Sequence, residues 1–402
     1  MRLVPYRFLI FLTISSISIV GCQKNKAPIL TSKFSKKNSS SPSETSSEIK
    51  QAALLAEQSV PEFLHRVHFT PGNKKLITEH LAEPLRKIQI ASTQKNAFNF
   101  EPQYPFEFYP YHKGWRIIGK AIEWNIEKAV IQKNPELALS EFLKANRFGF
   151  RLLEGGALDA SLGLSIVDHA RKAFLPILPL LNTEQLEQLG NSLLHLLQTK
   201  PVLTKTIEHE HQNMLAAVQY VQDAYTQNRL GEIQKKLGPD IKTGLTALHR
   251  ISNKSHEVIH YFDSLTSEAN QETQMMNEDA QKPMAIRQFK DYMFDKNRPW
   301  KKFSKHFFGS LRPLIIIHDR TIAWTRLLAL KALILKHIQQ TKKAPANLLK
   351  FQCELYEDPF SGKPFVYHAD GCDFKLYSVG ENLIDDGGQS DITKYRPDLV
   401  LE

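Results

Sequence analysis

Residues 358–402 read DPFSGKPFVYHADGCDFKLYSVGENLIDDGGQSDITKYRPDLVLE, which is the most distinctive stretch of the chain. It opens with the turn-forming pair Asp358-Pro359. Two short β-prone runs that contain aromatic residues, 365–367 and 374–377, lie on either side of the turn-like Ala-Asp-Gly at 369–371. This order predicts an antiparallel hairpin. We expect it to form the centre of a small α/β module at 341–402.

The loop after the hairpin is rich in glycine and in side chains that carry oxygen atoms. Calcium binds about six to eight oxygen ligands in a flexible shell, so this loop is a candidate calcium site. Its spacing differs from the EF-hand pattern. By composition alone, an acidic surface loop that binds no ion is the simpler interpretation. The candidate metal ligands are Ser378, Asn382, Asp385, Asp386 and Asp391.

The succession DPFSGKPFVY, LYSVGENLIDDGG and SDI resembles the C-terminal region of the major pseudopilins of type II secretion. The helical pattern of 324–340 and the following Pro345 are similar to that family too. The resemblance implies the fold of the module and a calcium ion in its loop. It places Asn382 where the family has an Asp ligand and Asp391 at the family's later Asp. The ending YSVG…DDGG is also similar to that of uncharacterised bacterial envelope lipoproteins.

Pseudopilins begin with a cleaved, methylated apolar helix that packs into a filament. We find no such helix in this sequence, so we expect the fold of the module without pilin assembly.

Two cysteines, Cys353 and Cys372, fall inside the predicted module. In an oxidising envelope, a pair of cysteines indicates a disulfide. The bond would close a loop of about 20 residues and stabilise the module by ~3 kcal/mol. Two free thiols are the alternative.

Residues 1–21 are organised like the signal peptide of a bacterial lipoprotein. Arg2 and Arg7 precede an apolar run at 8–20, which is too short to span a bilayer comfortably. Ile-Val-Gly-Cys at 19–22 resembles a lipobox, in which the thiol of the cysteine accepts the lipid. We expect lipidation of Cys22, including palmitate; a plain secretory peptide with a chance cysteine is the alternative. Gln23 indicates the outer rather than the inner membrane, with the body facing the periplasm or the exterior.

Residues 22–50 are rich in Ser, Lys and Pro and contain a single aromatic residue. Such a segment buries too little apolar surface to offset the entropy of ordering, so it predicts a flexible tether.

The pattern from 51 to 340 is helical. Leu139, Phe142, Ala145, Phe148 and Leu152 recur every three to four residues, as on one face of a helix. The fold class is therefore mainly α: an irregular array of helical hairpins, with the small module packed on helix 311–340. No repeat of fixed period is present. The expected helices cover 123–132, 136–153, 158–175, 183–198, 201–227, 245–270, 282–294 and 311–340.

One stretch, 99–111, contains three prolines and six aromatic residues and is expected to be extended. The simpler interpretation is a strap packed across the helices. A second interpretation is an aromatic lip that binds a peptide or a glycan. Its candidate ligand-binding residues are Tyr104, Phe106, Phe108, Tyr109 and Tyr111.

The sequence contains no P-loop, no G-x-G-x-x-G and no G-x-S-x-G motif. Glu208-His209-Glu210-His211 lacks the H-E-x-x-H zinc pattern and is typical of a solvated helix face. We assign no catalytic residues. An enzyme stays open, although a non-enzymatic protein is favoured, because dispersed catalytic residues leave no motif.

The net charge is +10, whereas 341–402 holds seven basic and eleven acidic residues and so carries −4. Basic and aromatic residues interleave at 282–305. This pattern is typical of a solvated helix face over an aromatic core. It also suits an anionic envelope polymer, whereas the export signal argues against nucleic acid.

Together these features predict a lipid-anchored envelope protein with a structural or interaction role. An envelope hydrolase or a glycan- or peptide-binding protein is the first alternative. An accessory of secretion or pilus-like machinery is the second.

Overall fold

The computed structural model describes residues 48–60, 71–94, 110–237, 248, 255–287, 311–389 and 398–401. The chain divides into two compact units, Met1–Ser46 and Ser47–Glu402, and all described residues belong to the second unit. This unit is mainly helical, with a small three-stranded antiparallel sheet near its C-terminal end. The predicted fold class is therefore confirmed.

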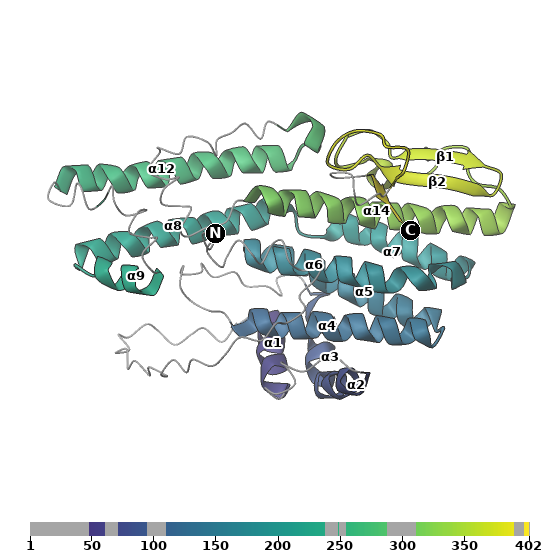
Figure 1. The fold of residues 1–402 in the computed structure, drawn as a ribbon, viewed down its shortest axis with the longest axis horizontal. Coiled ribbons are helices and arrows are strands. Elements are labelled where there is room, and N and C mark those ends of the chain that lie inside the picture. Colours follow the sequence, from purple (N-terminus) through teal and green to yellow (C-terminus); the bar gives the residue numbers. More distant parts are fainter. Residues whose placement is uncertain are drawn as a thin grey trace, which may run out of the picture. The chain divides into compact units, whose positions relative to one another are not determined.

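The described helices α4 to α9 follow one another along the chain with short connections (Figure 1). Among the described residues, no helix combines the length and the apolar content that crossing a membrane requires. The α-helices are α1 (Glu48–Ser59), α2 (Pro71–His80), α3 (Ala82–Ala91), α4 (Pro110–Ile131), α5 (Pro135–Arg151), α6 (Ala157–Phe174), α7 (Thr183–Thr199), α8 (Leu203–Thr226), α9 (Leu230–Leu237), α12 (Ser255–Ala280), α14 (Leu311–Thr341) and α15 (Cys353–Tyr356). Short 3₁₀ turns are η3 (Leu152–Glu154), η4 (Leu175–Leu180) and η5 (Met284–Ile286).

Helix starts follow the capping residues in the sequence. The Asn134 side chain accepts a hydrogen bond from the Leu137 backbone N–H at 3.0 Å, and Pro135 occupies the first helical position of α5. At α7, Asn182 and Gln185 form a reciprocal capping box, with bonds of 2.9 and 3.1 Å. Each cap satisfies backbone donors that the first turn of a helix leaves unpaired.

Helices α5 and α6 cross where two glycines face one another. A Cβ atom added to Gly163 would lie 2.1 Å from the Gly149 carbonyl oxygen, and one added to Gly149 would lie 2.6 Å from the Gly163 oxygen. Only hydrogen fits at these positions, so the two backbones come closer than ordinary side chains permit.

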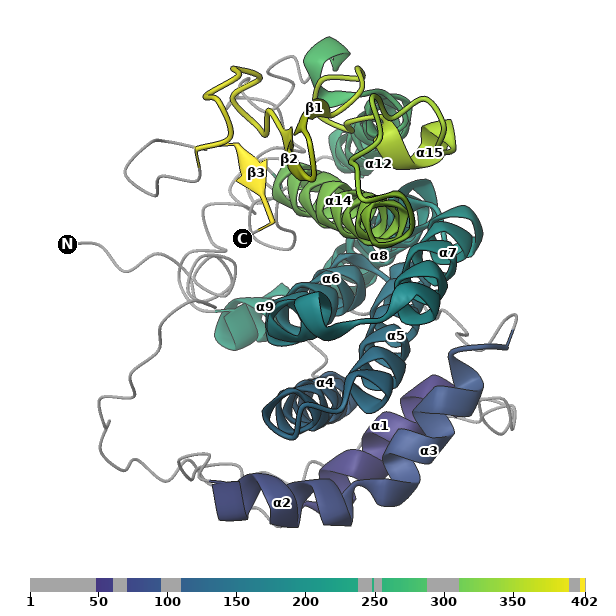
Figure 2. The ribbon, with the colours of Figure 1, turned by 90° about the vertical axis from the view of Figure 1, so that its right-hand side faces the viewer.

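Helix α14 links the two hydrophobic clusters of the body. Its first half contributes Ile315 and Ile322 to a cluster with α8, α9 and α12. Its second half contributes Leu327 and Leu330 to a cluster with α1, α4, α5 and α7. α14 therefore lies beside helices from both parts of the array, as Figure 2 shows nearly end-on.

The hairpin lies along the second half of α14 (Figures 1 and 2). Strand β1 (Val366–Asp370) pairs with β2 (Asp373–Ser378), and β2 pairs with β3 (Leu399–Val400), all antiparallel. Phe360, Phe365, Leu376 and Leu401 belong to the same cluster as the helical body. The module therefore has no separate core and is completed by α14.

Several expected boundaries change. The helix expected at 245–270 is α12, which begins at Ser255 and continues to Ala280. Only the 3₁₀ turn η5 is found in the described part of 282–294. The stretch expected to be extended ends earlier than predicted, because Pro110 and Tyr111 already belong to α4.

Replacing Gly163 by Ala should test the α5–α6 contact. Alanine gains ~1 kcal/mol in helix propensity, but the steric overlap should dominate and lower the free energy of unfolding by ~1–3 kcal/mol. The control is Gly72→Ala in α2, where an added Cβ meets nothing within 4 Å. Urea unfolding of both variants measures the difference. Equal stability of the two variants would contradict the close crossing.

Candidate functional site

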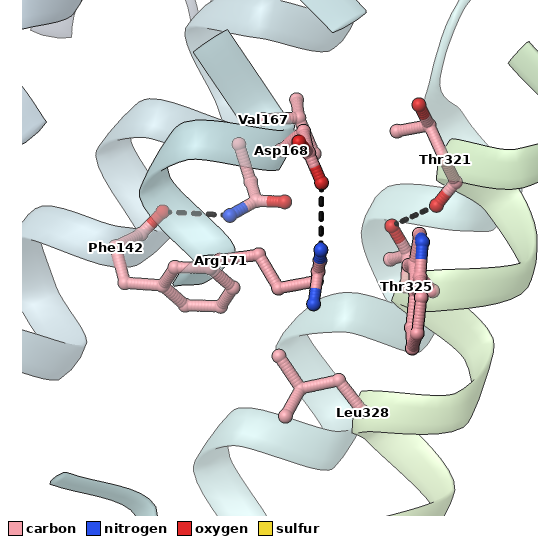
Figure 3. Close-up of a pocket in the computed structure, with 9 residues that line it drawn as sticks. Phe142, Val167, Asp168, Arg171, Thr321, Thr325 and Leu328 are labelled. Atoms are coloured by element: carbon pink, nitrogen blue, oxygen red, sulfur yellow. Dashed lines mark hydrogen bonds and ion pairs between the residues drawn. The ribbon is translucent and has the colours of Figure 1, made fainter. Parts of the chain in front are cut away.

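A pocket lies where α5, α6 and α14 meet (Figure 3). Its cavity volume is about 10 Å³, which is near the smallest space that can hold one water molecule and far below that of sites for drug-sized ligands. The lining residues are Phe142, Asn146, Val167, Asp168, Arg171, Thr321, Trp324, Thr325 and Leu328.

An ion pair occupies the polar side of this pocket. Arg171 and Lys172, which follow Asp168 by three and four residues on α6, each approach its carboxylate at 2.7 Å. Burial alone would raise the pKa of Asp168, but the charges and hydrogen bonds of Arg171 and Lys172 outweigh it and lower that pKa. Asp168 is therefore held as a carboxylate and is poorly suited to act as a general acid or base near neutral pH.

Arg171 also connects α6 to α14. Its guanidinium lies 4.2 Å from the ring centroid of Trp324, a cation–π contact. Arg171 is buried, and its Nε has no hydrogen-bond partner among the described residues. Neighbouring polar groups bond within their own helices: Asn146 donates to the Phe142 carbonyl at 2.8 Å and Thr325 to the Thr321 carbonyl at 2.7 Å. We call Arg171 a clamp because it holds α6 against Trp324 of α14.

The predicted calcium ligand Ser378 has another role. Its hydroxyl is buried and donates to Asp358 Oδ2 at 2.9 Å, while it accepts from the Gly380 backbone N–H at 3.1 Å. Asp358 is also buried and accepts from the backbone N–H groups of Phe360 and Val379. Burial raises the pKa of Asp358, and these hydrogen bonds offset part of that rise. Asp358 therefore organises the module, a role that its turn-forming sequence context does not reveal.

The acidic loop is folded by its own side chains. Asn382 donates to Asp386 Oδ2 at 3.0 Å and accepts from the Ile384 N–H at 3.1 Å. Asp385 Oδ1 accepts from the Tyr377 hydroxyl and from the Gly387 N–H, both at 2.9 Å. These bonds define turns and leave fewer oxygens for an ion than the sequence suggests.

Asp398 is the carboxylate that the sequence did not single out. It is 2% exposed, and its Oδ2 accepts from the N–H groups of Asp386 and Gly388 at 3.0 and 2.8 Å. Its Oδ1 is buried and accepts no hydrogen bond from the described residues. Burial raises the pKa of Asp398, and the charges of Asp386 and Asp385 add to the rise. A buried oxygen in this state is a fitting ligand for a cation.

Within the described part of the chain, no three His, Cys, Asp or Glu side chains converge closely enough to hold a metal ion. Asp391 lies outside the described residues, so the calcium site stays a prediction.

The expected disulfide is not formed in the structure. Cys353 and Cys372 are both free and exposed. Cys353 begins α15, and its thiol contacts Glu354 at 3.4 Å. Cys372 lies in the turn between β1 and β2, and its thiol donates to the Lys342 carbonyl at 3.0 Å. The two thiols thus belong to different parts of the module.

The five aromatic candidates for ligand binding fall into two groups. Tyr104, Phe106, Phe108 and Tyr109 lie outside the described residues. Tyr111 is buried in the first turn of α4, with its ring centroid 4.7 Å from that of Trp115. Tyr111 therefore belongs to the core and is not part of an exposed aromatic lip.

Two basic or acidic groups that we expected at the surface make tertiary contacts. Glu210 accepts a hydrogen bond from the Ala157 N–H in the first turn of α6 at 3.1 Å, which joins α8 to α6. Arg287, from the basic segment 282–305, forms a buried ion pair with Asp319. The described part of that segment ends at Arg287.

Comparisons of the chain with family models, with curated proteins and with solved structures give no match.

Replacing Arg171 by Ala should remove both the pair with Asp168 and the stack on Trp324. We expect the free energy of unfolding to fall by ~2–4 kcal/mol, because a large buried side chain loses its packing and its contact with Trp324, whereas Asp168 keeps Lys172 as a partner. Lys172→Ala is the matched control, since Lys172 pairs with the same carboxylate from an exposed position and should cost less than ~1 kcal/mol. Chemical denaturation distinguishes the two variants. Similar losses in both would show that Arg171 is not a clamp.

Proposed function

We propose that the protein is a structural or interaction protein of the bacterial cell envelope, held at a membrane by lipid on Cys22. The lipobox at 19–22 and the tether at 22–50 support the anchor. The outer membrane is the favoured location, with the body facing the periplasm or the exterior. Envelope proteins or anionic envelope polymers are the partners that we propose, in keeping with the net charge of +10.

The observation that carries this proposal is the shared core of module and body. Phe360, Phe365 and Leu376 pack in one cluster with α4, α5, α7 and α14. A module built this way cannot move as a separate lid or swing on a hinge. It supports a rigid surface, which suits a scaffold; the tether expected at 22–50 lies outside the described residues up to residue 47, and Glu48 already begins α1.

Three basic residues of α14 strengthen the same contact. Arg320 pairs with Glu381, Arg326 Nη1 donates to the Glu357 carbonyl at 2.5 Å, and Lys331 donates to the Leu401 carbonyl at 2.8 Å. They bind the acidic module at its beginning, middle and end.

Calcium is the second part of the proposal. Asp398 and one of Asp385 or Asp386 would be its ligands among the described residues, which do not by themselves bring three such groups together, and Asp391 would complete the set from outside them. The ion would neutralise these carboxylates and so stabilise the module. Ser378 is replaced by Asp398 in this set, because the Ser378 hydroxyl already bonds to Asp358.

Replacing Cys22 by Ala should release the protein from the membrane. We expect deletion of the gene to make cells sensitive to detergent and a wild-type copy to restore resistance. The wild-type chain should incorporate labelled fatty acid and sediment with membranes. The Cys22→Ala chain should fold but lose the label and fail to restore detergent resistance. Cys353→Ala is the control, because its exposed thiol should be irrelevant to both readouts. Full restoration by the Cys22→Ala chain would refute a membrane-bound structural role.

Calcium should raise the melting temperature of the full chain relative to chelator, because a ligand that binds only the folded state stabilises it. Asp398→Asn should remove this increase. Asp370→Asn, at the end of β1 and outside the acidic loop, should retain it. Calorimetry with calcium or with EDTA provides the measurement. Identical melting in the two conditions would mean that the loop is merely acidic.

A further inference from the structure

Two buried nitrogen atoms on α14 have no hydrogen-bond partner among the described residues, and a half-buried lysine follows α7. His318 is 8% exposed, and its Nε2 is buried with no partner among the described residues. Arg326 Nε is buried in the same state. Lys200, the residue that follows α7, is half-buried. Buried polar groups such as the two nitrogen atoms on α14 are rarely left without a partner, so each of the two calls for one.

The pairing of α7 with α14 brings these three residues together. The helices run antiparallel: the Thr183 hydroxyl donates to Gln339 at 2.7 Å, Lys336 pairs with Glu187 at 2.5 Å, and Gly190 faces Leu333. Each step forward on α7 corresponds to about one step back on α14. Continued along both helices, this register places Lys200 opposite 322–323, with His318 one turn to one side and Arg326 one turn to the other.

Cations and carboxylates both act at this position. Burial and the charge of Arg326 lower the pKa of Lys200 to about 8, against the opposing effect of Asp319. Asp319 forms its ion pair with Arg287. Glu357, Asp358, Asp319 and Glu354 act on Arg326, and of these Glu354 and Glu357 are exposed.

We propose that Lys200, His318 and Arg326 form a binding site for a phosphate group. Lys200 Nζ and Arg326 Nε donate to two of its oxygens. His318 Nδ1 faces Asp319 Oδ1 at 3.3 Å and therefore carries the ring proton. Its Nε2 is then an acceptor, and it receives a hydrogen bond from a protonated phosphate oxygen.

This arrangement favours phosphate over sulfate. A neutral histidine at this position is consistent with the burial that lowers the pKa of His318. Phosphate retains a proton near neutral pH and can donate it to Nε2, whereas sulfate has none. Free phosphate shares this chemistry with the monoanionic form of a phosphate monoester, whose second pKa is about 6. The site goes beyond the proposed envelope role and does not depend on the lipid anchor or on calcium.

Calorimetric titration of the full chain in detergent micelles with inorganic phosphate tests the site. Lys200→Met should weaken binding by ~10-fold or more, the effect of losing one charged hydrogen bond. Lys336→Met is the matched control on the same helix pair, since Lys336 already pairs with Glu187, and it should bind like the wild type. Equal binding by both variants, or no binding by the wild type, would overturn the proposal.

Two further ligands complete the titration. Sulfate should bind at least ~10-fold more weakly than phosphate, because it leaves His318 Nε2 without a donor. Equal affinity for the two anions would overturn the role of His318. Glycerol 3-phosphate distinguishes the sources: tighter binding than phosphate indicates a monoester or a lipid headgroup, and weaker binding indicates the free ion. Failure of both phosphate compounds overturns the site.

A measurement on the unmodified protein covers the case in which Lys200→Met does not fold. Because the pKa of Lys200 is about 8, its amine should react with an acylating reagent faster than ordinary lysines at that pH. Phosphate should slow the labelling of Lys200 and leave that of Lys336 unchanged, as peptide mass spectrometry would show. Labelling of Lys200 that phosphate does not slow would contradict the site.

Discussion

The burial of α14 is the constraint on which the rest of the structure depends. Its first half packs with α8, α9 and α12, and its second half with α1, α4, α5, α7 and the hairpin. A helix covered on so many sides must still accommodate its basic residues. Several of them pair with a group from another element, as Arg320 does with Glu381 and Lys331 with the Leu401 carbonyl.

The two sites follow from two faces of this helix. Thr321, Trp324 and Leu328 face α5 and α6, where the Asp168–Arg171 pair satisfies its own charges and forms a clamp. Arg326 reaches the module at the Glu357 carbonyl, and both His318 Nε2 and Arg326 Nε are buried without partners among the described residues. The first site therefore offers no unpaired charge to a ligand. The second has the unpaired groups that a ligand would satisfy, which is why the phosphate proposal rests there.

Local signals made much of the fold predictable from sequence. The caps at Asn134 and Asn182 and the hairpin at 366–378 depend on neighbouring residues, and the structure contains them. The contacts that define the sites do not. Arg171 meets Trp324 across more than a hundred residues, and Asp398 accepts from the Gly388 N–H although no pattern in the sequence singles Asp398 out. The disulfide prediction failed because compartment and spacing say nothing about where the two thiols point.

The central claim is that module and body form one cooperative unit around α14. Native-state hydrogen exchange tests it most directly, because it reports the free energy of opening for each amide. The account predicts that amides of β2 exchange only with the same global opening that releases the buried turns of α14. A hairpin that opens at a much lower free energy, while α14 and α7 stay protected, would contradict it and would make the module an independent appendage.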